Sequence, residues 1–259
     1  MFATLTRKQI QQSLAVGLVA GVLAGLFGVG GGFIMVPLYV MWVGLDQRKS
    51  HATSLAAVVP IAVAGAIGYA TTGDVVWHAA FALLAGSIFG ALYGVKLLGQ
   101  VSLKFLQLGF ATLLFASAVR LIWSSQPHLL LEGLPGIVLL IGVGFFAGVM
   151  SGLFGVGGGI IMVPALIIAS GVDAIQARGT SLAVIVGSGI SGTWANYRKG
   201  NIEVPFALLS GIAGIPAVFL GVYLSHSLPE RISVILFSFI LLSIAIQQVR
   251  KVINGQAQH

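Results

Sequence analysis

The chain has 259 residues, of which 58% are hydrophobic and only 7% are charged. Ordinary soluble domains carry roughly 25% charged residues, so this composition excludes a soluble fold and predicts an all-α polytopic membrane protein. The net charge of +7 comes from basic residues that stand singly or in pairs between apolar segments, which indicates membrane topology and argues against a nucleic-acid partner. The chain has no cysteine, so thiolate chemistry is excluded.

Five apolar segments follow one another in each half of the chain. They cover residues 10–27, 33–45, 51–71, 75–98 and 103–123, then 134–154, 160–170, 180–197, 202–224 and 232–249. The second segment of each half is too short to span a hydrocarbon core of about 30 Å at about 1.5 Å per residue. Because a glycine run precedes each of these short segments, we predict that both are half-helices.

The two halves are copies of one unit. A shift of 127 residues aligns GVLAGLFGVGGGFIMVP, which starts at Gly21, with GVMSGLFGVGGGIIMVP, which starts at Gly148. The same register places HATSLA, from His51, on RGTSLA, from Arg178. Repeats of this length are typical of the duplicated halves of transporters and channels. We therefore predict two structural repeats, residues 1–127 and 128–259, in one integral membrane domain.

The distribution of Lys and Arg between the two sides of the membrane distinguishes two possible topologies. If the first two segments of each half form a hairpin that returns to its starting side, the repeats are inverted and ten basic residues lie inside. If those segments form one broken span, the repeats are parallel and the count is seven inside against six outside. Cytoplasmic loops carry an excess of Lys and Arg, so we predict inverted repeats. The inside set is Arg7, Lys8, Arg48, Lys49, Lys96, Lys104, Arg198, Lys199, Arg250 and Lys251, against Arg120, Arg178 and Arg231 outside.

The predicted fold is therefore a glycine-broken helical hairpin followed by three transmembrane helices in each repeat. Both termini are expected in the cytoplasm, and the protein is expected in the inner membrane. The charge count shows only whether each repeat crosses the membrane an odd or an even number of times. It therefore leaves open whether the broken segments dip in and return or cross fully.

The glycine runs are the first candidate for a substrate site. A helix break at membrane depth is tolerated only where protein buries it or where it lines a watery cavity. Each run also precedes a half-helix whose first N–H groups carry a partial positive charge, which would attract an anion. The alternative is that the glycines only permit a tight hairpin. The residues concerned are Gly28, Gly30, Gly31, Gly32, Gly155, Gly157, Gly158 and Gly159.

Hydroxyl and basic side chains in equivalent positions are the second candidate. His51 is followed by Thr53 and Ser54, and Arg178 is followed by Thr180 and Ser181. One interpretation is that these hydroxyls cap the start of the third helix. The other is that they donate hydrogen bonds to anion oxygens, with His51 or Arg178 supplying positive charge. A loop histidine such as His51 is also commonly just solvated.

Glycines at spacing four, such as Gly17, Gly21 and Gly25, predict close helix packing, and the same faces would also permit a homodimer. The six acidic residues all lie at segment ends, which argues against proton or sodium coupling through a buried carboxylate.

The duplicated pattern G-x-F-G-x-G-G-G-x-x-x-x-P, from Gly25 to Pro37 and from Gly152 to Pro164, resembles the TauE/SafE family of sulfite exporters. The later His-x-Thr-Ser and Arg-Gly-Thr-Ser stretches are similar to that family as well. The resemblance covers nearly the whole chain. It implies secondary transport of a small sulfur-containing anion such as sulfite, thiosulfate or a sulfonate, while substrate and direction differ among members.

Two function classes remain open. The first is a carrier that exports such an anion by alternating access, with Arg178 as the charged partner. The second is a passive anion channel with re-entrant half-helices. An enzyme is disfavoured because the sequence has no nucleophile beside a base, no metal-ligand cluster and no nucleotide motif. No cofactor is expected, and the expected partners are a small anion and the lipid bilayer. The coupling ion and the oligomeric state stay undetermined.

Overall fold

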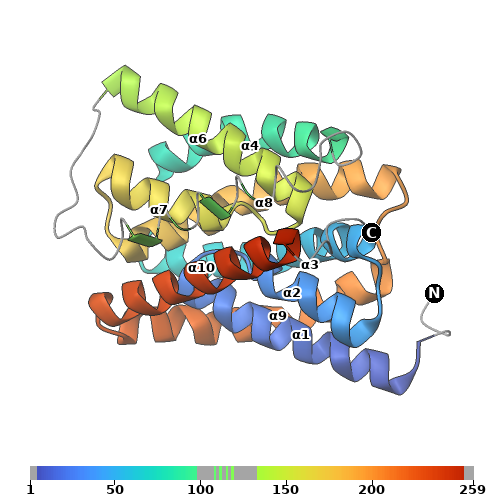
Figure 1. The fold of residues 1–259 in the computed structure, drawn as a ribbon. Coiled ribbons are helices and arrows are strands. Elements are labelled where there is room, and N and C mark those ends of the chain that lie inside the picture. Colours follow the sequence, from blue (N-terminus) through green and yellow to red (C-terminus); the bar gives the residue numbers. More distant parts are fainter. Residues whose placement is uncertain are drawn as a thin grey trace.

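The computed structural model describes residues 5–97 and 133–253, together with positions 108, 111, 112, 115, 118 and 119. The helices of these parts form one bundle (Figure 1). They are α1 (Arg7–Phe27), α2 (Gly32–Leu38), the π-helix η1 (Tyr39–Val43), α3 (Gln47–Thr71), α4 (Trp77–Leu97), α6 (Gly133–Phe154), α7 (Gly159–Ser170), α8 (Ala174–Arg198), α9 (Val204–Ser227) and α10 (Glu230–Ile253). The predicted segment 103–123 lies mostly outside the described residues.

Aspartate caps set where the third helix of each half begins. The Asp46 side chain accepts a hydrogen bond from the backbone N–H of Lys49, and Asp173 accepts one from Gln176, which satisfies one of the N–H groups left free at a helix start. The expected starts at residues 51 and 180 were therefore too late. As a result, neither basic site residue lies in a loop, and both lie inside a helix.

The glycine runs break the chain as predicted. Gly28, Gly30 and Gly31 have φ values of +69°, +75° and +74°, a left-handed conformation that glycine adopts without a steric penalty. The equivalent glycines of the second half, Gly155 and Gly157 among them, do the same. The helical segments after the breaks are as short as expected: α2 and η1 together end at Val43, and α7 has 12 residues.

The first helix of each half packs on the fourth helix of the other half. A Cβ atom on Gly17 would come within 2.2 Å of the Ser210 oxygen, and one on Gly25 within 2.2 Å of the Val218 oxygen. On α4 and α6 the corresponding contacts pair Gly86 with Ile141, Gly90 with Phe145 and Gly94 with Val149. These distances confirm the predicted packing role of the spaced glycines, because only glycine lets the backbones approach so closely.

The two third helices cross side by side in the middle of the bundle and run antiparallel. Gly65 on α3 faces Leu182 on α8, while Gly192 near the end of α8 faces Leu55 near the start of α3. In Figure 1, α4 and α6 lie on one side of these two helices, and α1 and α9 lie on the other.

Facing residues also give the direction of the other helices. Where two helices touch, the residue numbers of both increase in the same direction for four pairs of helices: α1 and α9, α3 and α9, α4 and α6, and α4 and α8. Helices α1, α3 and α9 therefore run one way, and α4, α6 and α8 run the opposite way. Because α1 and α3 are parallel, α2 and η1 must carry the chain back towards the end where α1 began.

Five helices among the described residues are long and apolar enough to cross a membrane: α1, α3, α4, α6 and α9. Helix α8 also has 25 residues, but it carries more polar side chains. Several of these, including Arg178, Thr180, Ser181, Ser188 and Asn196, are buried inside the bundle. The helices therefore indicate a membrane protein, and these polar side chains of α8 face inward.

Candidate functional site

The two glycine breaks lie against each other in the interior of the bundle. A Cβ atom on Gly32 would lie 2.4 Å from the carbonyl oxygen of Gly155, and one on Gly159 would lie 2.7 Å from the oxygen of Gly28. Val29, in the first break, is fully buried. The structure therefore brings together the two motifs that the sequence suggested as a single site.

Each break also packs against the third helix of the opposite half. A Cβ atom on Gly28 would lie 2.4 Å from the Cα of Arg178, and one on Gly155 would lie 2.0 Å from the oxygen of His51. The side chain of Val58 on α3 lies next to both Gly30 and Gly157. The predicted glycines and the two predicted basic residues thus form one continuous region between α3 and α8.

Arg178 is the buried cation of this region. Only 2% of its surface is exposed, and its Nη1 donates a hydrogen bond to Ser225 Oγ at 2.7 Å. Tyr69 lies beside it, since Gly179 packs against the Tyr69 ring, and the Tyr69 hydroxyl donates to the Gly25 carbonyl at 2.6 Å. The structure thus holds a guanidinium inside the bundle, on a residue whose backbone packs against the first break.

An ion pair lies near this cation at the end of the bundle where α9 finishes. The Asp74 carboxylate contacts His226 Nε2 at 2.8 Å, and the two side chains are 22% and 31% exposed. The Tyr69 and His226 rings lie 5.6 Å apart. Sequence reasoning missed Tyr69, Ser225 and His226 as neighbours of Arg178, because their equivalents in the first or second half are different residue types and the repeat gave no signal for them.

His51 is buried, with 9% exposure, and its Nδ1 lies 2.6 Å from the carbonyl oxygen of Phe154. A carbonyl can only accept, so Nδ1 carries the proton in this contact. The interpretation of His51 as a solvated loop residue is wrong. The imidazole instead closes the C-terminal end of α6 beside the second break.

The two serines differ although their positions are equivalent. Ser54 Oγ lies within hydrogen-bond distance of two carbonyl oxygens, those of Gly32 at 3.2 Å and Gly155 at 3.0 Å, and so ties both breaks together. Ser181 Oγ is buried, lies 2.9 Å from where a Gly159 Cβ would be, and has no hydrogen-bond partner among the described residues. A buried hydroxyl without a partner is unusual and costly.

The two threonines accept hydrogen bonds from the backbone of the other half. Thr53 Oγ1 accepts from the N–H of Glu203 at 3.0 Å, and Thr180 Oγ1 accepts from the N–H of Val76 at 2.9 Å. Both donors precede a fourth helix, α9 and α4. The expectation that these hydroxyls cap their own helices is therefore wrong; they satisfy the N–H group at the entrance of a helix from the other half.

Comparison with known proteins identifies the family of the chain. The family described as "Sulfite exporter TauE/SafE" matches residues 3–121 and 140–259. The chain belongs to the TauE/SafE family. It is 27% identical over 243 residues to a probable membrane transporter protein of Methanocaldococcus jannaschii, covering 88% of this chain and 91% of that protein. It is 29% identical over 251 residues to a probable membrane transporter protein of Xylella fastidiosa, covering 93% and 95%. No solved structure matches the chain significantly.

As a TauE/SafE protein, the chain belongs to a family of membrane transporters and not to a family of enzymes. Within the parts of the chain that the structure describes, no three His, Asp or Glu side chains lie close enough to hold a metal ion. The polar groups around the breaks are hydroxyls, one imidazole and one guanidinium. These groups suit an oxyanion better than a cation, because hydroxyl, imidazole N–H and guanidinium groups donate hydrogen bonds to anionic oxygens.

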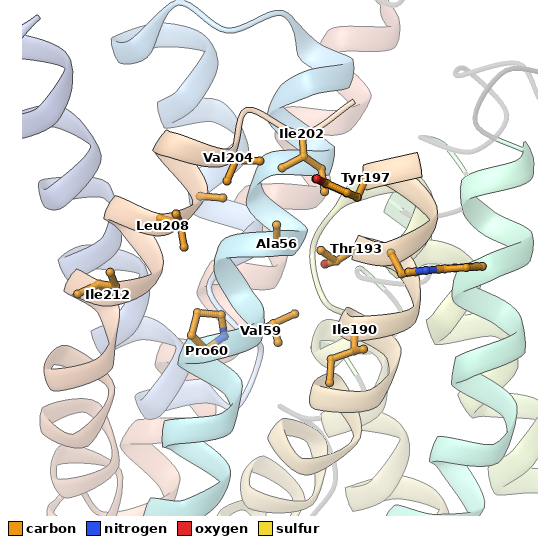
Figure 2. Close-up of a pocket in the computed structure, with 12 residues that line it drawn as sticks. Ala56, Val59, Pro60, Ile190, Thr193, Tyr197, Ile202, Val204, Leu208 and Ile212 are labelled. Carbon is orange, nitrogen blue, oxygen red and sulfur yellow. The ribbon is translucent and has the colours of Figure 1, made fainter. Parts of the chain in front are cut away.

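A groove of about 500 Å³ opens elsewhere, between α3, α8 and α9 (Figure 2). Its lining is almost wholly apolar, and none of the predicted site residues contributes to it. The groove is therefore separate from the region around the glycine breaks in this TauE/SafE chain.

Proposed function

We propose that this chain is a secondary transporter that exports a small sulfur-containing anion, sulfite or a related sulfonate or thiosulfate. The observation that carries the proposal is the position of Arg178. An arginine with 2% exposure, whose backbone packs directly against a helix break inside a membrane bundle, is costly and marks a pathway for an anion in such proteins. Membership in the TauE/SafE family supports the choice of a sulfur oxyanion.

The proposed binding region comprises both glycine runs together with His51, Thr53, Ser54, Arg178, Thr180 and Ser181. Within it, the groups assigned to the anion itself are the guanidinium of Arg178, the hydroxyl of Ser181 and the first backbone N–H groups of α7. Ser181 supports this role because its hydroxyl has no partner among the described residues. An oxyanion would accept its proton, as it would accept from amides at a helix start. Thr53, Thr180 and Ser54 are assigned mainly to holding the breaks in place.

The proposed topology has two inverted repeats, residues 1–127 and 128–259, with both termini in the cytoplasm of a cell with an inner membrane. Two observations support it. The equivalent helices α3 and α8 run antiparallel, as a twofold axis in the membrane plane requires. The charge count favours the same arrangement, since the start of α3 and the end of α8 then share one basic side.

Alternating access is favoured over a passive channel because the region is tightly closed. Val29, Val58 and Ile185 are fully buried around the breaks, so an anion cannot pass without a movement of the two halves. In the proposed mechanism one half rocks against the other and exposes Arg178 to each side in turn. A channel would instead need a continuous polar path through the same region.

Thermal unfolding of the purified protein with a panel of anions tests the proposed site. A ligand that binds only the native state raises the melting temperature by mass action. Sulfite, thiosulfate or a sulfonate should raise it, while chloride and phosphate should not, and Arg178→Ala should abolish the response. Stabilisation by a cation or a neutral solute alone would overturn the anion assignment.

A further inference from the structure

The groove of Figure 2 is lined almost wholly by apolar side chains, and its rim lies where α8 ends. Pro60, Ile190 and Ile212 lie along its body, whereas Tyr197 and Ile202 lie where α8 ends and α9 begins. Its volume of about 500 Å³ falls in the range of pockets that bind small ligands, roughly 300 to 1,000 Å³. An empty groove of this kind on a membrane helix bundle must be filled by hydrocarbon or by another protein surface.

One positive charge lies at this rim. The Arg198 guanidinium lies 5.0 Å above the ring of Trp194, a residue that lines the groove, and it makes no ion pair with a described residue. The Lys199 ammonium does not add to it, because Nζ donates to the carbonyl oxygen of Val95 on α4 at 2.8 Å. The nearby carboxylate, Glu203, is already bound by Lys49 at 2.6 Å. Arg198 therefore keeps its positive charge next to an aromatic side chain of the groove.

The repeat provides an internal comparison. The residues equivalent to Trp194 and Arg198 in the first half are Ile67 and Thr71. The equivalent surface of the first half thus has no cation over an aromatic ring. The pair is not part of the duplicated scaffold, so it distinguishes this groove from the equivalent surface of the first half.

We propose that this groove binds an anionic phospholipid, with one acyl chain along Pro60 and Ile190 and the phosphate on Arg198. Basic pockets between membrane helices on the cytoplasmic side bind anionic headgroups, and Trp and Tyr lie at headgroup level. The topology proposed above places the rim on that side. A second copy of the chain fits less well, because it would bring an equal basic rim towards this one.

Lipid titration followed by native mass spectrometry tests the proposal, with phosphatidylglycerol compared against phosphatidylcholine of the same acyl chains. The wild-type chain should bind phosphatidylglycerol more tightly. Arg198→Gln should weaken that binding about fivefold, the value expected for one cation near an anionic lipid surface. Arg7→Gln removes an exposed cation at the same end of the bundle and should leave the affinity unchanged.

A second pair of variants tests the groove itself. Ile190→Trp fills it and should remove the tightly bound lipid, while Val63→Trp, at the equivalent position of the first half, should not. The melting temperature without lipid shows that each variant is folded. Equal affinity for the two lipids, or unchanged binding in both Arg198→Gln and Ile190→Trp, would overturn the proposal. If Ile190→Trp instead turned a dimer into a monomer with lipid binding intact, the groove would be an interface between copies.

Discussion

Gly28 lies directly against Arg178, so that a Cβ atom on Gly28 would approach the Arg178 Cα to 2.4 Å. The left-handed turn that breaks the first hairpin and the buried cation of the second half are therefore one structural unit.

Gly28→Ala should destabilise the protein by more than its backbone conformation alone predicts. Alanine at a φ of +69° costs about 1 to 3 kcal/mol, and the added methyl group also collides with the α8 backbone. Gly73→Ala is the matched control, since Gly73 has a φ of +80° and open space around it. Thermal unfolding should show a larger loss for Gly28→Ala. Equal losses would mean that the contact with Arg178 is loose.

Arg178→Lys should keep the fold but weaken anion binding about tenfold or more, because lysine keeps the charge and loses the planar, forked donor geometry of the guanidinium. Ser225→Ala is the control. It removes the partner of Nη1 at a cost of about 1 kcal/mol of stability, while the guanidinium stays. Transport assays should give a raised KM for Arg178→Lys and a nearly normal one for Ser225→Ala. The reverse order would assign Arg178 to the scaffold.

The two serines should separate stability from binding. Ser54→Ala removes the donor to the carbonyls of Gly32 and Gly155 and should cost about 1 to 3 kcal/mol. Ser181→Ala removes no hydrogen bond to a described residue, so the melting temperature should stay the same or rise while sulfite affinity falls. Melting curves with and without sulfite measure both effects. A Ser181→Ala protein with unchanged affinity would exclude this hydroxyl from the site.

The threonine contacts predict that replacing either hydroxyl lowers the stability of the protein. Thr53→Val and Thr180→Val each leave a helix-entrance N–H without its acceptor, that of Glu203 or Val76, and should cost about 1 to 3 kcal/mol. Serine at either position keeps the acceptor oxygen and should restore most of the stability. Chemical or thermal unfolding provides the measurement, and a Thr→Ser variant as unstable as Thr→Val would refute the capping role.

The inverted arrangement predicts opposite labelling of equivalent residues. The chain has no cysteine, so single cysteines react without background. Arg48→Cys and Ile175→Cys stand at equivalent positions near the starts of α3 and α8. An impermeant thiol reagent applied to intact cells should label Ile175→Cys alone, and permeabilised cells should label both. Labelling of both in intact cells would favour parallel repeats.

Much of this architecture could be predicted from the sequence because the repeated motifs consist of residue types, above all glycine, that have strong local backbone and packing preferences. Glycine runs gave both breaks, and spaced glycines gave the helix interfaces. Hydropathy alone starts α3 too late, because the capping residue Asp46 is followed by the polar residues 47–50, which belong to the helix but not to its apolar segment.

The surroundings of Arg178 could not be predicted for a different reason. Its partner Ser225 and its neighbour Tyr69 come from helices of both halves, and such contacts are set by the interleaved packing of the bundle. The equivalence of Ser54 and Ser181 was visible in the sequence. Their difference in hydrogen bonding depends on small displacements between the halves, which a residue pattern does not record.

Counterflow in proteoliposomes tests the central claim most directly. Purified protein is reconstituted into vesicles loaded with unlabelled sulfite, and labelled sulfite is added outside. A carrier should show saturable uptake that internal sulfite accelerates, with both properties lost in Arg178→Ala and retained in Arg231→Ala. Uptake that rises linearly with concentration and ignores internal sulfite would indicate a channel, and no sulfur-anion flux at all would contradict the proposed function.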